Sequence, residues 1–334
     1  MKDVALPVPD AELACDLRTI ANNRLLASLR YLLDVGKALG LQGERAQQYL
    51  DAVDVSRKFS GMLHVINDTL VGSIRHRDGR AAQKALDVLC ELRLGRAEVS
   101  VGGLYDRKYP FDAYSLYVDA VSRSYRRTYG SEVDFKVSCD KEFGTSVKTA
   151  ETALRRLKAV DPDSWREMMI YVSDVFVVHS MTMNASTSVC ALGIIRISHL
   201  KPEQSWGRYF ENLVHETAHQ HLNHIFLVDK LIENEDSGLY SSPLRREPRP
   251  LSGILHALFV LARTIRAQNR LISHPSYDAV RDQINSAYNN SGNTASFEVK
   301  LNDCWVTLSQ HARLTATGKR LVSNAMDMAL TSTG

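Results

Sequence analysis

The chain has 334 residues, of which 44% are hydrophobic and 24% are charged, and its formal net charge is +3. These fractions are typical of an ordinary globular protein, and so small a charge argues against a dedicated nucleic-acid-binding protein. Five cysteines without CxxC spacing fit neither a disulfide framework nor a zinc finger, so we expect a cytoplasmic protein. The chain also lacks the apolar runs of a signal peptide or a membrane span, so we expect no membrane association.

The N-terminal half carries a succession of helical patterns. Apolar residues recur mostly at intervals of three and four from Ala11 to Leu41, and Gly40 is expected to end this helix. Further helical patterns cover residues 45–53, 58–74, 79–94, 113–127 and 142–160. Tyrosine and arginine interleave in 113–127, an arrangement that can bind a nucleic acid or a peptide. Because these tyrosines fall near helical spacing, we favour a packed helix with a solvated basic face.

The periodicity then changes. Residues 168–179 and 189–198 are rich in β-branched and aromatic side chains and predict two strands. The short polar stretch between them predicts an antiparallel hairpin. We therefore expect an α+β fold that is mostly helical. A helical N-terminal half would be followed by a small antiparallel sheet, which the next helix and a buried C-terminal helix would pack.

A helical pattern from Arg208 to Lys230, which neither proline nor glycine interrupts, contains the motif HExxH at His215, Glu216 and His219. Residues four apart lie one turn above each other on the same helix face. The two imidazoles can therefore bind one transition metal, with Glu216 beside them. Chance is the plain alternative, since two more histidines follow, but the apolar residues on both sides of the motif favour a functional helix.

A metal site of this kind needs a third protein ligand. His256 is the first candidate because it lies in an otherwise apolar helix predicted for residues 251–272, where imidazole nitrogens must find partners. A hydrogen bond to the backbone is the alternative for this residue. Glu233, Glu235 and Asp236 are rivals, since one class of zinc peptidases completes its site with a downstream glutamate. They lie in an acidic, turn-like stretch and are more simply interpreted as solvent-facing.

Three prolines within residues 243–250 hold this segment extended and stiff. Arg249 stands between Pro248 and Pro250, and Arg245 lies in the same segment. An arginine held at a fixed place can grip a carboxylate through two parallel hydrogen bonds. Arg249 is therefore the first candidate for binding a small acid and Arg245 the second, with a surface arginine as the alternative for each.

These motifs together resemble the HExxH-type 2-oxoglutarate-dependent peptide β-hydroxylases that act in ribosomal-peptide maturation, a branch of natural-product biosynthesis. The likeness rests on the HExxH motif and on the segments Tyr240–Arg245 and Pro248–His256. It covers residues 214–262, and the N-terminal half carries no matching motif.

The resemblance implies iron(II) held by His215, His219 and His256, with 2-oxoglutarate and O2 as cosubstrates. It implies that Arg249, or else Arg245, binds the far carboxylate of 2-oxoglutarate. Glu216 would then orient a ligand or the cosubstrate. The expected partner is a ribosomally synthesised precursor peptide, and no nucleic acid.

Two other interpretations stay open. In a zinc-dependent peptidase, Glu216 would be the general base that activates a metal-bound water. In a helical scaffold, the histidines would hold a structural zinc or no metal. For the domains, Asp161-Pro162-Asp163 indicates a boundary between a helical region, 1–160, which is a candidate for peptide binding, and a metal-binding catalytic region, 161–334. A single domain is the alternative.

Overall fold

The computed structural model describes residues 3–92, 98–103, 109–130, 140–180, 183–199, 205–275 and 296–331. Of the residues in these ranges 67% are helical, and they include a small sheet, which confirms the mostly helical α+β class. In the first part of the chain the elements are α1 (Ala11–Gly36), the 3-10 helix η1 (Lys37–Leu39), α2 (Glu44–Asp51), α3 (Met62–Arg75), α4 (Gly79–Glu91), β1 (Ser100–Gly103), α5 (Phe111–Tyr129) and α6 (Asp140–Val160). They continue with α7 (Pro162–Tyr171), β2 (Asp174–Val178), β3 (Ala185–Ser186), the 3-10 helix η2 (Val189–Ala191), β4 (Ile194–Ser198), α8 (Trp206–Phe226), β5 (Tyr240–Ser242), β6 (Arg245–Arg249), α9 (Leu251–Ile272), α11 (Phe297–His311) and α12 (Ala316–Thr331).

The chain divides into two compact units, each built from separated segments. Unit 1 consists of Met1–Leu17, Lys148–Met168 and Leu200–Gly334, and unit 2 consists of Arg18–Val147 and Met169–His199. Because α1, α6 and α7 each run from one unit into the other, the division between the units is not the single cut expected near residue 160.

Unit 2 contains the larger sheet, whose strand order is β1-β2-β4-β3. β2 runs parallel to both β1 and β4, and only β3 is antiparallel to its neighbour. The predicted hairpin of 168–179 with 189–198 was therefore wrong. Residues 168–171 belong to α7, and β2 and β4 are parallel neighbours. The physical reason is that β-branched runs of this kind do not encode direction, and all five residues of β2 are buried, as is typical of parallel strands.

The helices of unit 2 share a core with this sheet. In α5, the rings of Tyr114 and Tyr117 are buried, and their centroids lie 6.4 Å and 5.4 Å from that of Phe176 on β2. Arg123 of the same helix is exposed and pairs with Asp68 at 3.1 Å. The prediction of a packed helix with a solvated basic face is thereby confirmed.

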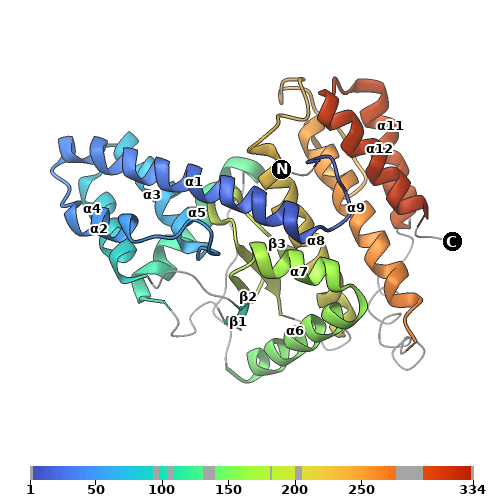
Figure 1. Ribbon diagram of the computed structural model, residues 1–334, viewed down its shortest axis with the longest axis horizontal. Helices are drawn as coiled ribbons and strands as arrows, with labels where there is room; N and C mark the ends of the chain where they lie inside the picture. The colour runs from blue at the N-terminus through green and yellow to red at the C-terminus, as the bar shows by residue number, and fades with distance from the viewer. Residues whose placement is uncertain are drawn as a thin grey trace. The chain divides into compact units, whose positions relative to one another are not determined.

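Unit 1 is organised around α9, which contacts α8, α11 and α12 (Figure 1). The first half of α9 is buried almost throughout, as its apolar sequence predicts. In α11, Leu308 is buried, whereas Trp305 is 38% exposed. None of the described helices has both the length and the apolar composition that a membrane crossing requires.

The proline-rich segment of unit 1 forms a two-stranded antiparallel ribbon. Tyr240 of β5 lies opposite Arg249 of β6, and Ser242 lies opposite Arg245. Both strands contact α9. The extended conformation expected for residues 245–249 is thus present, and β6 leads through Pro250 directly into α9.

Candidate metal centre

The HExxH motif lies in the middle of α8. The helix begins at Ser205, whose hydroxyl accepts a hydrogen bond from the backbone N–H of Gly207 at 3.3 Å. His215 and His219 are partly exposed, whereas Val214 and Ala218 beside them are buried. The ring centroids of His215 and His219 are 5.0 Å apart, as expected for residues one turn apart on one face.

His256 of α9 lies directly against this pair. Its Nδ1 is 3.1 Å from Nδ1 of His219, and the two ring centroids are 5.2 Å apart. The ring of Phe226 also stacks on His256, with its centroid 5.3 Å from that of His256 and an interplanar angle of 17°. Burial lowers the pKa of His256 to about 4. The ring is therefore neutral at physiological pH, which is the state that binds metals.

The distance between the two nitrogens suits a shared cation. A first-row metal binds imidazole nitrogen at about 2.0–2.1 Å, which puts two neighbouring donors about 3 Å apart. No group of three or more His, Cys, Asp or Glu side chains within the described ranges is arranged to hold a metal ion. The residues present therefore fit a metal in part. His219 and His256 are in place, and the ring centroid of His215, one turn away on the same helix, lies 5.0 Å from that of His219.

The acidic rivals for the third ligand are turned to solvent. Glu233, Glu235 and Asp236 are all exposed. Asp236 accepts a hydrogen bond from the hydroxyl of Ser252 at 2.8 Å, on the first turn of α9. His256, which lies 3.1 Å from His219, is thus a better third donor than any of these carboxylates.

Glu216 is 3% exposed. Its backbone position beside His215 follows from the helix. Burial at this position is compatible both with a base that acts on a metal-bound water and with a group that orients a ligand, so it does not discriminate between the two roles considered for this residue.

Arg249 lies along the first turn of α9. A Cβ atom added to Gly253 would come 3.2 Å from Cβ, 3.7 Å from Cγ and 3.8 Å from Cδ of Arg249, so the aliphatic stem of this arginine passes over the glycine. Gly253 and His256 are three residues apart and share a helix face. The stem of Arg249 therefore lies on the face of α9 that carries His256 one turn later. The side chain of Arg245, the second candidate, lies outside the described part of the chain.

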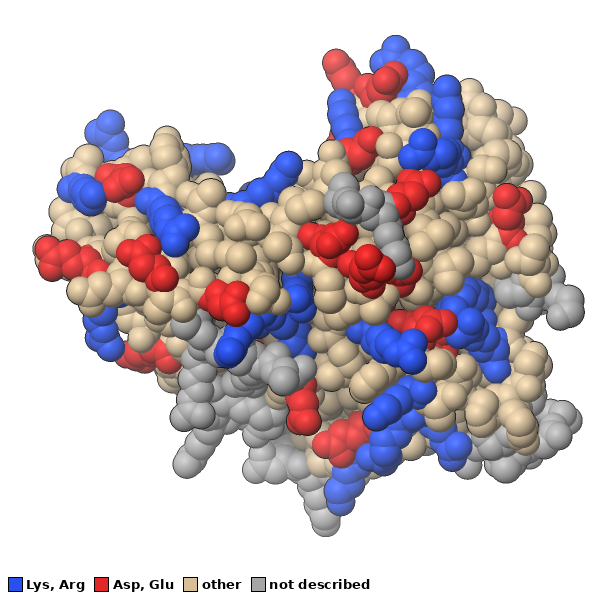
Figure 2. All heavy atoms as spheres, viewed as in Figure 1, with Lys and Arg blue, Asp and Glu red and all other residues tan. Residues whose placement is uncertain are grey.

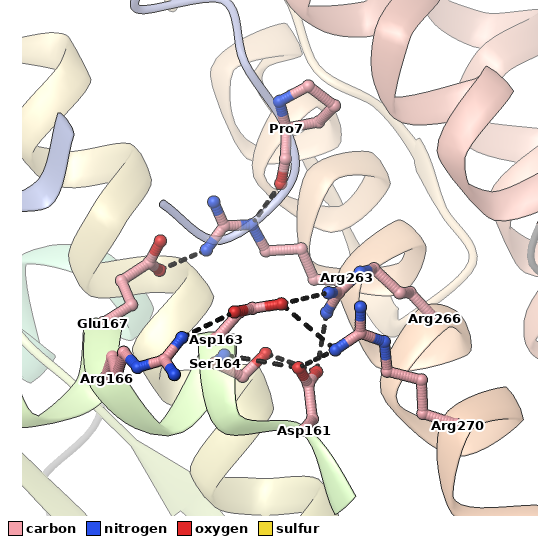
Figure 3. Close-up of polar contacts among 9 residues, drawn as sticks. All are labelled: Pro7, Asp161, Asp163, Ser164, Arg166, Glu167, Arg263, Arg266 and Arg270. Atoms are coloured by element: carbon pink, nitrogen blue, oxygen red, sulfur yellow. Dashed lines mark hydrogen bonds and ion pairs between the residues drawn. The ribbon is translucent and has the colours of Figure 1, made fainter. Parts of the chain in front are cut away.

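Sequence reasoning missed a group of buried charges that links α7 to α9 (Figure 3). Arg263 forms an ion pair with Glu167 and donates from Nε to the carbonyl oxygen of Pro7 at 2.8 Å. Arg266 donates to Asp161 at 2.6 Å. Burial raises the pKa of Glu167, although the Arg263 guanidinium works in the opposite direction. The only signal in the sequence was the recurrence of arginines along a helix that is otherwise apolar.

Comparison of the chain with models of known protein families and with curated proteins gives no match. Inference about function therefore starts from the geometry of the histidines and of Arg249.

Proposed function

We propose that this protein is an iron(II)- and 2-oxoglutarate-dependent oxygenase that hydroxylates a side-chain β-carbon of a ribosomally synthesised precursor peptide in the cytoplasm. The observation that carries the proposal is the 3.1 Å approach of His219 and His256, which come from two helices and are 37 residues apart. A third histidine, with the downstream carboxylates exposed, favours an oxygenase over the zinc peptidase in which a glutamate completes the site.

In this proposal His215, His219 and His256 hold the metal. Three protein donors leave positions for a bidentate cosubstrate and for dioxygen. When bound, iron(II) supplies the redox chemistry that couples oxidative decarboxylation of 2-oxoglutarate to hydroxylation of the peptide. The stacked ring of Phe226 restricts the orientation of His256 and shields one of its faces from water. Glu216 orients a neighbouring ligand from its buried place on α8.

Arg249 is the proposed anchor for the far carboxylate of 2-oxoglutarate. Its backbone is restrained by Pro248 and Pro250, and its stem lies against Gly253 on the His256 face of α9. A guanidinium can hold a carboxylate through two parallel hydrogen bonds, which an ammonium group does not reproduce. Arg245 remains the second candidate for this role.

The test measures succinate after iron(II), ascorbate, 2-oxoglutarate and a candidate precursor peptide are added to metal-free protein. We expect succinate in amounts that depend on iron, and a mass increase of one oxygen atom in the peptide. His256→Ala should abolish both, whereas the control His311→Ala, an exposed histidine of the same unit, should retain them. Absence of succinate together with zinc-dependent cleavage of the peptide would instead identify a peptidase.

The role of Arg249 is tested separately. Arg249→Ala should raise the 2-oxoglutarate concentration for half-maximal succinate formation by about tenfold or more, because a charge-assisted bidentate contact is lost. The 2-oxoglutarate concentration for half-maximal succinate formation in Arg249→Lys should lie between those of Arg249→Ala and the wild type. Iron binding, measured by equilibrium dialysis, should be unchanged in both. A 2-oxoglutarate requirement equal to that of the wild type in Arg249→Ala would exclude this role.

A further inference from the structure

A second contact between α8 and α9 lies close to the histidines. Glu167 of α7 forms an ion pair with Arg263 of α9, and its Oε2 lies 3.3 Å from Nδ1 of His221 on α8. The side chains of Glu167 and His221 are fully buried, and that of Arg263 is 3% exposed. One carboxylate thus contacts both of the helices that carry the candidate metal ligands. Figure 3 shows the contact of Glu167 with Arg263.

Phe259 of α9 contacts both His221 and Arg263. His221 stacks on Phe259 of α9 with centroids 5.8 Å apart and an interplanar angle of 7°. The guanidinium carbon of Arg263 lies 4.6 Å from the centroid of the same phenyl ring. We call Glu167, His221, Phe259 and Arg263 the carboxylate clamp. It includes residues two positions after His219 and three positions after His256.

The clamp resists relative movement of the two helices. A shift of α8 along α9 would separate His221 from Phe259 and pull Glu167 away from one of its two partners. An ion pair that is broken while buried leaves an uncompensated charge, so a shift that separates Glu167 from Arg263 is strongly unfavourable. The 3.1 Å contact of His219 with His256 spans the same two helices and needs a fixed register, because donors at metal distance tolerate only small displacements.

We propose that Glu167 is a positioning residue for the histidine centre, holding α8 and α9 in the register in which His219 and His256 can share one cation. This inference rests on the proposed metal centre and adds to it a residue that touches neither metal nor substrate. It differs from a purely structural role because the loss of Glu167 should change metal binding more than overall stability explains.

Asp161 offers a matched control. It too is a fully buried carboxylate that pairs with arginines of α9, with Arg266 at 2.6 Å and Arg270 at 2.8 Å. Its remaining hydrogen bonds go to Ser164, its own neighbour along the chain. Asp161→Asn therefore removes a buried charge of the same kind, immediately before α7, while the residues of the carboxylate clamp are unchanged.

The experiment titrates metal-free full-length protein with Co²⁺ and follows the visible absorption bands, whose position and intensity report the number and geometry of the ligands. Urea unfolding is measured on the same samples without metal. We expect Glu167→Gln to weaken Co²⁺ binding by about tenfold or more, as is usual when a group that orients metal ligands is lost, and to alter the absorption bands. Asp161→Asn should keep the wild-type bands and an affinity within about twofold, even where its urea midpoint falls equally.

A second pair of variants keeps the test valid if Glu167→Gln fails to fold. His221→Asn keeps a side-chain nitrogen close to the position of Nδ1 and should preserve Co²⁺ affinity. His221→Phe keeps the stack on Phe259 but loses the polar contact with Glu167, and should weaken Co²⁺ binding.

The outcomes separate this inference from the proposed function. Unchanged Co²⁺ binding in Glu167→Gln, equal weakening in Asp161→Asn, or the reverse order of the two His221 variants would overturn the positioning role alone. Wild-type protein that binds no Co²⁺ through His219 and His256, as judged from His219→Ala and His256→Ala, would overturn the proposed metal centre and this inference with it.

Discussion

His219 and His256 illustrate how a partly buried polar pair can become a ligand site. Each ring contributes its Nδ1 to the 3.1 Å contact, and the ring of His256 also stacks on Phe226. A neutral imidazole has one donor and one acceptor nitrogen, so the two rings can satisfy each other when no metal is present. Since the pKa of His256 is lowered to about 4 by burial, a cation does not have to displace a proton from this ring at physiological pH.

At the same scale, the side chain of Asp229 stabilises the turn that follows α8 by accepting hydrogen bonds. Its Oδ1 accepts hydrogen bonds from the backbone N–H of Leu231 at 2.8 Å and from the hydroxyl of Thr315 at 2.9 Å. Leu231 has φ 61°, a left-handed conformation that a leucine adopts only when its surroundings hold it there. Burial would raise the pKa of Asp229, but hydrogen bonds from Leu231 and two threonines hold it below the ordinary value of 3.8.

We predict that Asp229→Ala lowers the free energy of unfolding by about 1 kcal/mol near neutral pH, because both donors lose their acceptor. A carboxylate whose pKa is lowered by folding stabilises the protein above its unfolded pKa, and this contribution is lost as the pH falls through the folded pKa. The difference between variant and wild type in urea unfolding should therefore shrink as the pH falls past 3.8 and through the lower folded pKa of Asp229. A difference that grew on acidification would contradict this account. Asp229→Asn keeps an acceptor oxygen, so its free energy of unfolding should lie between those of Asp229→Ala and the wild type.

Among the elements, α12 depends on a close approach to the chain after α8. A Cβ atom at Gly318 would come 2.2 Å from the carbonyl oxygen of Leu231, which is far inside contact distance. The same stretch is joined by the N–H of Thr315, which donates to that carbonyl at 2.9 Å, and by the bridge between Ile232 and Leu314. The start of α12 is thus fixed against backbone and not against a flexible side chain.

We predict that Gly318→Ala destabilises the protein by about 1–3 kcal/mol, since the helix or the turn has to move to admit one methyl group. Gly72→Ala provides the control. Gly72 lies inside α3 with no atom within 4 Å of an added Cβ, so this substitution should stabilise the protein by about 1 kcal/mol through helix propensity. Thermal unfolding of both variants measures the two effects. A neutral result for Gly318→Ala would show that the turn yields easily.

For the whole molecule, we consider the distribution of charged side chains on the face drawn in Figure 2. On the face drawn in Figure 2, basic and acidic residues of the described parts lie interspersed, and no broad basic surface stands out. A nucleic-acid-binding protein usually gathers lysine and arginine along one face. The small net charge of +3 and this distribution therefore agree.

The residues of the proposed site all belong to one of the two units. All candidate ligands, Arg249 and the carboxylate clamp belong to unit 1, while the mixed sheet and the aromatic core of α5 belong to unit 2. A ligand that binds only the folded state stabilises the region that forms its site. The effect of a metal should consequently be local to the helices of unit 1.

We predict that Co²⁺ slows backbone hydrogen exchange in α8 and α9 and leaves exchange in α3 and α4 of unit 2 unchanged, because local opening of the ligand helices then requires loss of the metal. Mass spectrometry of peptides from these helices measures the effect. His219→Ala should remove the protection. Equal slowing in both units would indicate binding elsewhere or a general effect of the cation.

Much of the local structure could be read from periodicity. The helix predicted for 251–272 is α9 with the same bounds, and Gly40 ends the first helical segment with φ 75° as expected. The directions of β2 and β4 could not be read, because alternating or buried apolar runs look alike in parallel and antiparallel pairs. Residues 168–171 were mistaken for strand since short apolar runs suit either a buried helix or a strand.

The amino-acid sequence by itself determined most of the helices, although not α7, and also the shared face of His215 and His219 and the stiff setting of Arg249. These features depend on backbone geometry within a few residues. Only the tertiary structure decided that His256 meets His219 and that Glu167 contacts both ligand helices. Those facts depend on packing between segments far apart in the chain, where the favourable partner is selected by burial and shape, which no local pattern encodes.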